Sequence, residues 1–149
     1  GDMGVGECAG EVVSLTEVEL QSAERICFEA QVDLEDGKLN EAEEKAYKAM
    51  IRGASALLRK EFQDISSDPD EIVADFKQHF FDTKLFWDRF AHGKFGKYLI
   101  NRNENPPANL DNDSVHRQIE ESQLFIEAAH ACYAKMMDIE KKEQSGKVL

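Results

Sequence analysis

A glutamate and a histidine near the C-terminus have the spacing of a metal-binding pair. Glu127 and His130 form a Glu-x-x-His segment, which places both side chains on one face of a helix, as in the di-iron sites of helical bundles. Such a site needs a second pair and two further glutamates on facing helices, and the sequence offers only this one pair. We therefore expect His130 to be packed or solvated. Because no Cys-x-x-Cys segment occurs, structural zinc is not expected either.

The N-terminal glycines are spaced somewhat like a phosphate-binding loop. Gly4, Gly6 and Gly10 lie in GVGECAG, but no strand precedes them and no Lys-Ser/Thr pair follows, so nucleotide binding here is not favoured. Cys8 lies in the same segment, and no histidine accompanies it in the sequence to activate its thiol. We expect residues 1–13 to form a Gly-rich loop or extended tail.

A third group of candidates mixes charges with aromatic rings. Asp88, Arg89, His92, Lys94 and Lys97 lie among several aromatic residues. They could line a binding cleft, or they could be a solvated face above a buried aromatic underside. The second interpretation is favoured, because long charged side chains commonly cover apolar surface in this way.

The net charge limits the partners of the chain. Thirty acidic residues against 18 basic ones give −12, and such a charge repels nucleic-acid backbones and anionic membrane surfaces. No apolar run approaches the roughly 18 residues of a membrane span, and no signal peptide is visible. The odd number and wide spacing of Cys8, Cys27 and Cys132 argue against a disulfide framework, so a cytoplasmic protein with reduced thiols is expected.

The first helix must begin near residue 15. Ser14 and Thr16 each precede a glutamate by three residues, which is the spacing of a capping box. The helix should end at Asp36-Gly37, because glycine commonly follows the last turn. We expect one helical domain over residues 14–143 and a frayed tail over residues 144–149.

The helix expected over residues 40–62 is the centre of the fold. Asn40 and Glu43 have the capping-box spacing. Apolar or small residues then recur at steps of three and four, which predicts a helix that is largely buried on one side. They are Ala46, Tyr47, Met50, Ile51, Gly53, Ala54, Leu57 and Leu58. Its polar side would carry Ser55 among charged residues.

The second half of the chain predicts further helices. Asp68-Pro69 marks a helix start, and residues 82–105 should form a helix that is irregular near Gly93 and Gly96. The two prolines at 106–107 require a loop. Asp113 or Ser114 should cap a last helix that ends near residue 142. The sequence therefore predicts an all-α protein, an antiparallel bundle of four or five helices.

The central helix is similar to one in the HEPN superfamily of helical-bundle domains. The resemblance extends over residues 15–142 and rests on Gly37, Lys38, Ala42, Ala46, Tyr47, Ala49, Met50, Ala54, Ala56, Leu57 and Leu58. A tetratricopeptide hairpin is the alternative, but its repeat should recur about 34 residues later and does not. The HEPN resemblance implies a bundle that pairs with a second copy.

The same resemblance implies a place where ribonuclease members carry an Arg-Asn pair followed by a histidine. Arg102 and Asn103 stand at that place, but the positions where the histidine should follow are Pro107, Ala108 and Asn109. Without it no acid–base group is in place, so RNA cleavage is not expected. Arg102 and Asn103, with Lys97 nearby, could still bind a nucleotide or another anion.

Residues 3–13 resemble the C-terminal end of a nitrite/sulfite reductase. This implies that the chain is an accessory domain of a larger redox enzyme, whose sirohaem and [4Fe–4S] cluster would be held by the reductase part. Because the cysteine spacings for those groups do not occur here, no cofactor is expected in this chain. Its expected function is that of a non-catalytic HEPN-like accessory or interaction domain. The alternative is a nucleotide- or RNA-binding module.

Overall fold

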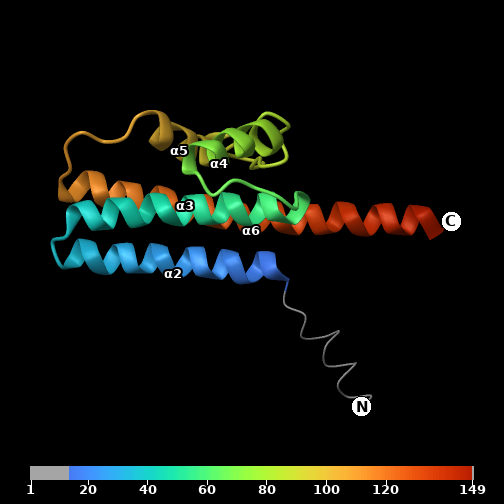
Figure 1. The fold of residues 1–149 in the computed structure, drawn as a ribbon, viewed down its shortest axis with the longest axis horizontal. Coiled ribbons are helices and arrows are strands. Elements are labelled where there is room, and N and C mark those ends of the chain that lie inside the picture. Colours follow the sequence, from blue (N-terminus) through green and yellow to red (C-terminus); the bar gives the residue numbers. More distant parts are fainter. Residues whose placement is uncertain (1–13, 149) are drawn as a thin grey trace, which may run out of the picture.

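The computed structural model describes residues 14–148, and every regular element in that range is a helix (Figure 1). Five α-helices and one π-helical turn follow in order: α2 (Leu15–Glu35), α3 (Leu39–Glu61), α4 (Pro69–Phe76), η1 (Lys77–Phe81), α5 (Lys94–Glu104) and α6 (Asn112–Val148). The only β-type pairing among these residues is an isolated bridge between Asp88 and His92. The predicted all-α fold is therefore confirmed. No helix in the described range is long and apolar enough to cross a membrane.

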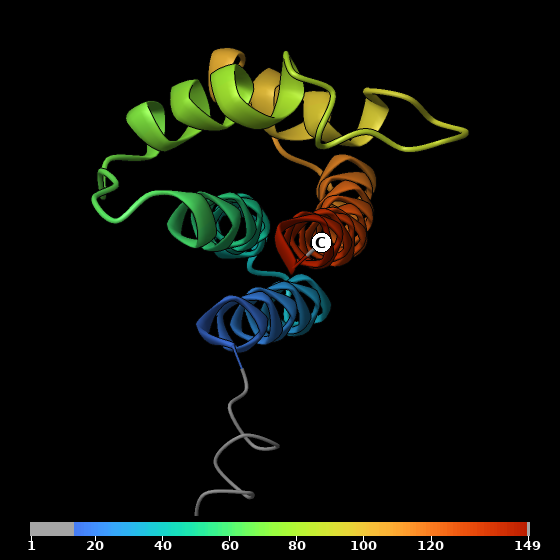
Figure 2. The ribbon, with the colours of Figure 1, turned by 90° about the vertical axis from the view of Figure 1, so that its right-hand side faces the viewer.

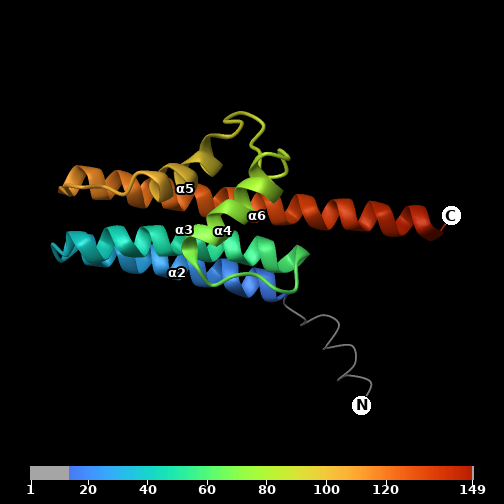
Figure 3. The same ribbon diagram turned by 45° about the horizontal axis from the view of Figure 1, so that its top comes forward.

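The helices form layers around α3 and α6. Figure 2 shows these two helices side by side, with α2 on one side and the chain from α4 to α5 on the other. The C-terminal part of α6 projects past the ends of α2 and α3 (Figure 3). This helix continues to Val148, several residues beyond the predicted end near residue 142.

Local capping chemistry sets several helix ends. Ser14 caps α2 by accepting a hydrogen bond from the Glu17 backbone N–H at 3.1 Å, as predicted. Gly37 follows α2 with a φ of 77°, a conformation that glycine adopts without the steric penalty of a side chain. Asp68 caps α4 in the predicted way. The cap of α6 is Asp111 rather than Asp113 or Ser114, because its carboxylate accepts from the Ser114 N–H at 2.7 Å.

The predicted capping box of the central helix is wrong. Helix α3 begins at Leu39 with Lys38 as its N-cap residue, and no side chain caps it. The carboxylate of Glu43 is bound by Arg102 instead, so it does not turn back to the helix start. Ser55 is also buried rather than solvated, because neighbouring helices surround the middle of α3.

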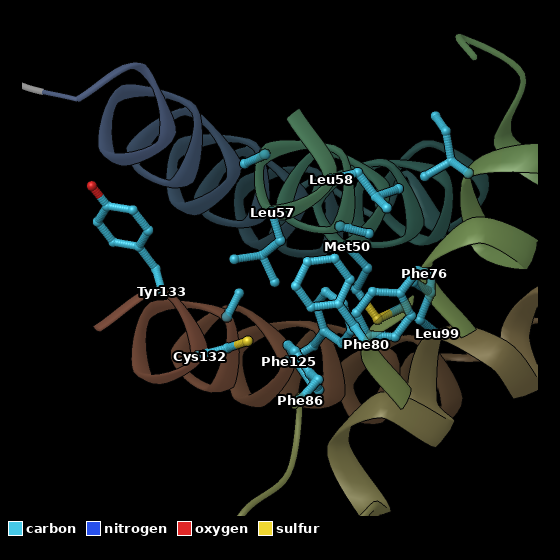
Figure 4. Close-up of a cluster of buried hydrophobic side chains, with 14 of the residues drawn as sticks. Met50, Leu57, Leu58, Phe76, Phe80, Phe86, Leu99, Phe125, Cys132 and Tyr133 are labelled. Atoms are coloured by element: carbon cyan, nitrogen blue, oxygen red, sulfur yellow. The ribbon is translucent and has the colours of Figure 1, made fainter. Parts of the chain in front are cut away.

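The larger of two apolar clusters lies between α3, α6 and the α4–α5 layer (Figure 4). Its centre is aromatic: the ring centroids of Phe76 and Phe86 are 4.9 Å apart, and those of Phe86 and Phe125 are 5.0 Å apart. Such close ring pairs add to the stabilisation from burial alone. Because Phe125 comes from α6, this cluster fastens the α4–α5 layer to the helix pair beneath it.

The segment predicted as an irregular helix over residues 82–105 is instead a loop followed by a helix. α5 begins only at Lys94. A Cβ atom on Gly93 would lie 2.9 Å from the Trp87 ring, and one on Gly96 would lie 2.7 Å from the Phe81 ring. Both glycines therefore allow aromatic rings to pack directly against the backbone.

Candidate functional site

The predicted anion-binding arginine is held by a carboxylate of the central helix. Arg102 Nε donates to Glu43 Oε2 at 2.5 Å, and its Nη2 donates to Oε1 at 3.0 Å. The side chains are 14% and 5% exposed. This two-bond geometry satisfies both carboxylate oxygens and neutralises the guanidinium charge.

Tyr47 completes the attachment of α5 to α3. The Arg102 guanidinium lies 4.1 Å from the centre of the Tyr47 ring, within the range of a cation–π contact. Asn103 donates to the Tyr47 hydroxyl at 3.0 Å and to Asp70 Oδ1 at 2.8 Å. The Arg-Asn pair thus connects α5 with both α3 and α4.

Two open hollows flank the Arg102–Glu43 pair. One, of about 320 Å³, lies towards α6 and is lined in part by Arg117 and Gln118. The other, of about 740 Å³, lies between the α2–α3 turn and the loop that carries Pro106 and Pro107. No histidine or cysteine of the described chain lines either hollow. Arg102 and Glu43 line both, so a small polar ligand could approach the pair, but it would have to compete with Glu43 for the guanidinium.

Lys97, the third predicted residue of this group, is exposed on α5 and lines neither hollow. The structure therefore brings Arg102 and Asn103 together with Glu43 and Tyr47, and not with Lys97. The sequence pattern predicts a helix cap for Glu43 and does not indicate its partnership with Arg102. The only indication of a partner in the sequence is that the charged Glu43 stands at a position on the buried face of the helix, where a charged residue usually requires one.

The histidine of the Glu-x-x-His segment in α6 pairs with a single glutamate of α2. His130 Nε2 lies 2.7 Å from Glu24 Oε1 of α2, an inter-helix contact at the surface. Within residues 14–148 no three histidine, cysteine, aspartate or glutamate side chains converge as a metal site would require.

The described cysteines lie in separate apolar clusters, Cys27 in one and Cys132 in the other. Burial raises the pKa of the Cys27 thiol, and burial raises the pKa of Cys132 to about 12. Both thiols therefore stay protonated at neutral pH, whereas a cluster ligand or a nucleophile must be a thiolate. These two residues do not fit an iron–sulfur ligand set. Cys8 and the glycines near it lie outside the described residues.

The charged residues of the group 88–97 do not converge on one cleft: Asp88, Arg89 and His92 lie in a projecting loop, whereas Lys94 and Lys97 lie in α5. Asp88 and His92 pair through their backbones, and the Phe90 side chain between them is 85% exposed. The prediction of a solvated face over buried aromatic rings holds for Phe86, which is buried, but not for Phe90, which is exposed.

Comparison with known proteins gives no family for this chain. No family model matches it, and no curated protein shows significant similarity to it.

Proposed function

We propose that this chain is a non-catalytic helical interaction domain, of the kind that the HEPN resemblance implies, and that it pairs with a second copy of itself. The observation that carries the proposal is the Arg102–Glu43 pair. A phosphate-binding arginine must present its donors to the ligand, whereas the Nε and Nη2 donors here bind a buried carboxylate. No histidine of the described chain lines either adjoining hollow, so both lack the residue that most often acts as a general acid or base near neutral pH. Burial raises the pKa of one lining carboxyl, that of Glu121 in the smaller hollow.

Exposed apolar side chains support the interaction role. Large apolar residues lie at the surface of α2, of the loop before α5 and of the projecting part of α6. The most exposed are Leu15, Phe28 and Phe90. Apolar groups gathered at a surface commonly mark protein interfaces.

The alternative function is nucleotide or RNA binding in the hollows beside Arg102, and Arg117 in the lining of the smaller one favours it. Two variants separate the functions. Glu43→Gln releases the Arg102 guanidinium, so a true anion site should bind a fluorescent RNA oligonucleotide or ATP more tightly, whereas Arg102→Ala should abolish that binding.

We expect no cleavage of RNA and no saturable binding of RNA or ATP by the wild-type chain or by Glu43→Gln at physiological salt. Cleavage by the purified chain that is lost in Arg102→Ala would overturn the non-catalytic assignment. Saturable binding that follows the two variants as described would establish the alternative. Self-association is measured separately, as the molar mass of the chain in solution.

A role as the C-terminal accessory domain of a nitrite/sulfite reductase is a further part of this proposal. It rests on residues 3–13, which lie outside the described range. Its test is co-purification of a tagged chain with a reductase that shows the absorption of sirohaem.

A further inference from the structure

The loop formed by residues 84–93 is closed by its own hydrogen bonds. The backbone N–H groups of Asp88 and His92 donate to each other's carbonyl oxygens at 2.9 and 2.8 Å. Asp88 Oδ1 also accepts from the N–H groups of Ala91 and Phe90, at 2.6 and 2.7 Å. These bonds lower the pKa of Asp88, so the carboxylate remains charged and holds the turn at neutral pH.

The same loop stores backbone strain at two positions. Lys84 and His92 have φ values of 61° and 56°, a left-handed conformation in which the Cβ atom of a non-glycine residue crowds the following carbonyl oxygen. Trp87 holds this arrangement in place: its ring stacks on His92 with centroids 6.0 Å apart, and the Lys84 ammonium lies 5.2 Å from its centre. Strained residues of this kind cluster at functional sites, where the surrounding structure fixes them.

The strained loop presents one apolar side chain to solvent. Phe90 is the most exposed large apolar residue among those described, and the Arg89 guanidinium lies 5.6 Å from its ring centre. Lys84 lies in the same loop and Lys94 follows it at the start of α5. With Asp88 as the carboxylate among them, this segment has a net positive charge within a chain of net charge −12. An ordered loop with an exposed aromatic residue and an arginine has the composition of an interface hot spot.

Single-stranded nucleic acid is a poorer match than a protein for this loop. Such ligands need several aromatic faces on which successive bases stack. The Trp87 ring is flanked by His92 and Lys84 and is 37% exposed, whereas Phe90 is 85% exposed, so Phe90 is the main aromatic ring that the loop presents. The loop therefore fits a pocket that takes one ring and is bordered by negative charge.

The chain itself has a hollow with these properties. An open hollow of about 490 Å³ lies between the end of α3, η1 and the projecting part of α6. Phe62 and Ile139 form part of its lining and are 38% and 41% exposed. Its charged lining is mainly acidic, with Glu61, Glu140 and Glu143. Lys60 and His79 line it as well, and Lys60 pairs with Glu140 at 3.0 Å, so Glu61 and Glu143 supply the excess negative charge.

We propose that in the homodimer each copy inserts Phe90 into the hollow of the other copy, with Arg89 and Lys84 facing the carboxylates at its border. This inference rests on the proposed self-association. Leu85, at the base of the loop, lines the chain's own hollow, so donor loop and acceptor hollow are neighbours on one side of the molecule. A two-fold axis between them lets both contacts form at once and closes the assembly as a dimer.

The outer face of α2 is the competing surface, and charge disfavours it. Leu15, Val18, Phe28 and Val32 are exposed there. However, α2 carries six carboxylates and a single basic residue, Arg25. Glu19 and Asp33 are paired with Arg59 and Lys45 of α3, and the other carboxylates leave this face acidic. Pairing two such helices would place like charges together, whereas the loop and the hollow carry opposite charges.

Sedimentation velocity of the full chain tests this contact. Phe90→Ser removes the inserted ring, and Phe28→Ser is the matched control on α2; both residues are exposed, so both variants should fold. Because the dimer contains two inserted rings, we expect Phe90→Ser to weaken dimerisation by roughly a hundredfold, and Phe28→Ser to leave it unchanged. Raising the salt to 1 M should weaken the wild-type dimer, because the facing charges are screened.

A mixing experiment identifies the acceptor. Ile139→Arg fills the hollow with a cation, so this variant should be monomeric but retains its Phe90. When Ile139→Arg is mixed with Phe90→Ser, the Phe90 ring of the first variant can insert into the intact hollow of the second. We therefore expect heterodimers in the mixture, although neither variant dimerises alone.

A wild-type dimer that survives Phe90→Ser would overturn the loop contact and leave the proposed function standing, and its loss in Phe28→Ser would move the interface to α2. A dimer lost in Phe90→Ser without rescue on mixing would overturn the hollow as acceptor. A wild-type chain that stays monomeric at about 200 μM would overturn self-association itself, and with it this inference.

Discussion

Removal of the Arg102 side chain should cost much of the stability of this domain. In Arg102→Ala the Glu43 carboxylate, which is 5% exposed, loses both of its hydrogen bonds from the guanidinium. Breaking a buried ion pair by deleting one partner costs about 3–5 kcal/mol, because the remaining charge is left without compensation. Since domains of this size are stable by about 5–15 kcal/mol, the expected loss is large.

Urea unfolding followed by far-ultraviolet circular dichroism measures this effect. Arg25→Ala is the matched control, because Arg25 is exposed on α2, and it should change the free energy of unfolding by no more than about 0.5 kcal/mol. Arg102→Lys should fall between wild type and Arg102→Ala, because a lysine keeps the charge but cannot form the two-bond fork. Replacement of both Glu43 and Arg102 by leucine should recover most of the loss, since no buried charge remains.

A loss below about 1 kcal/mol in Arg102→Ala would refute this reasoning. It would show that Arg102 contributes little to folding, and the function of its guanidinium would then have to be sought in ligand binding. Calorimetric titration with inorganic phosphate, ATP and RNA would follow directly.

Three further predictions concern stability and reactivity. Gly96→Ala should lower the free energy of unfolding by about 1–3 kcal/mol through overpacking, because its Cβ would lie 2.7 Å from the Phe81 ring. The control Gly146→Ala, whose Cβ would have no atom within 4 Å, should not destabilise the fold; equal urea midpoints for the two variants would contradict the overpacking at Gly96. In a Cys8→Ser chain, Cys27 and Cys132 should react with a thiol reagent at pH 8 only after unfolding, and fast reaction in the native state would show that they are accessible. Burial raises the pKa of Cys132 from 9.0 to about 12, so the thiol ionises in the unfolded state first, and the free energy of unfolding should fall by up to about 1.4 kcal/mol per pH unit above pH 9. Denaturant titrations over this pH range should show a shallower fall in Cys132→Ala. Equal pH slopes in wild type and variant would contradict Cys132 as the cause.

Helix starts could be predicted where a local side chain sets them. Ser14 and Asp68 lie within three residues of the N–H groups that they bind, so their pattern in the sequence is sufficient. The same pattern failed at Glu43, because its partner Arg102 is 59 residues away in the chain and a helix-length pattern contains no information about it.

The loop before α5 could not be predicted for a related reason. Its form depends on left-handed residues that are not glycine, Lys84 and His92, and on the packing of Trp87 and Phe81 against glycine backbone. No local propensity favours these features. Of the predicted anion-site residues, Arg102 and Asn103 follow each other in α5, but their partners on α3 and α4 depend on the tertiary fold.

The molar mass of the wild-type chain in solution tests the central claim most directly. Light scattering on a size-exclusion column, over a concentration series up to about 200 μM, should show the mass rise towards twice 16.9 kDa. A mass that remains at 16.9 kDa over the whole series would contradict the account of this chain as a self-pairing interaction domain.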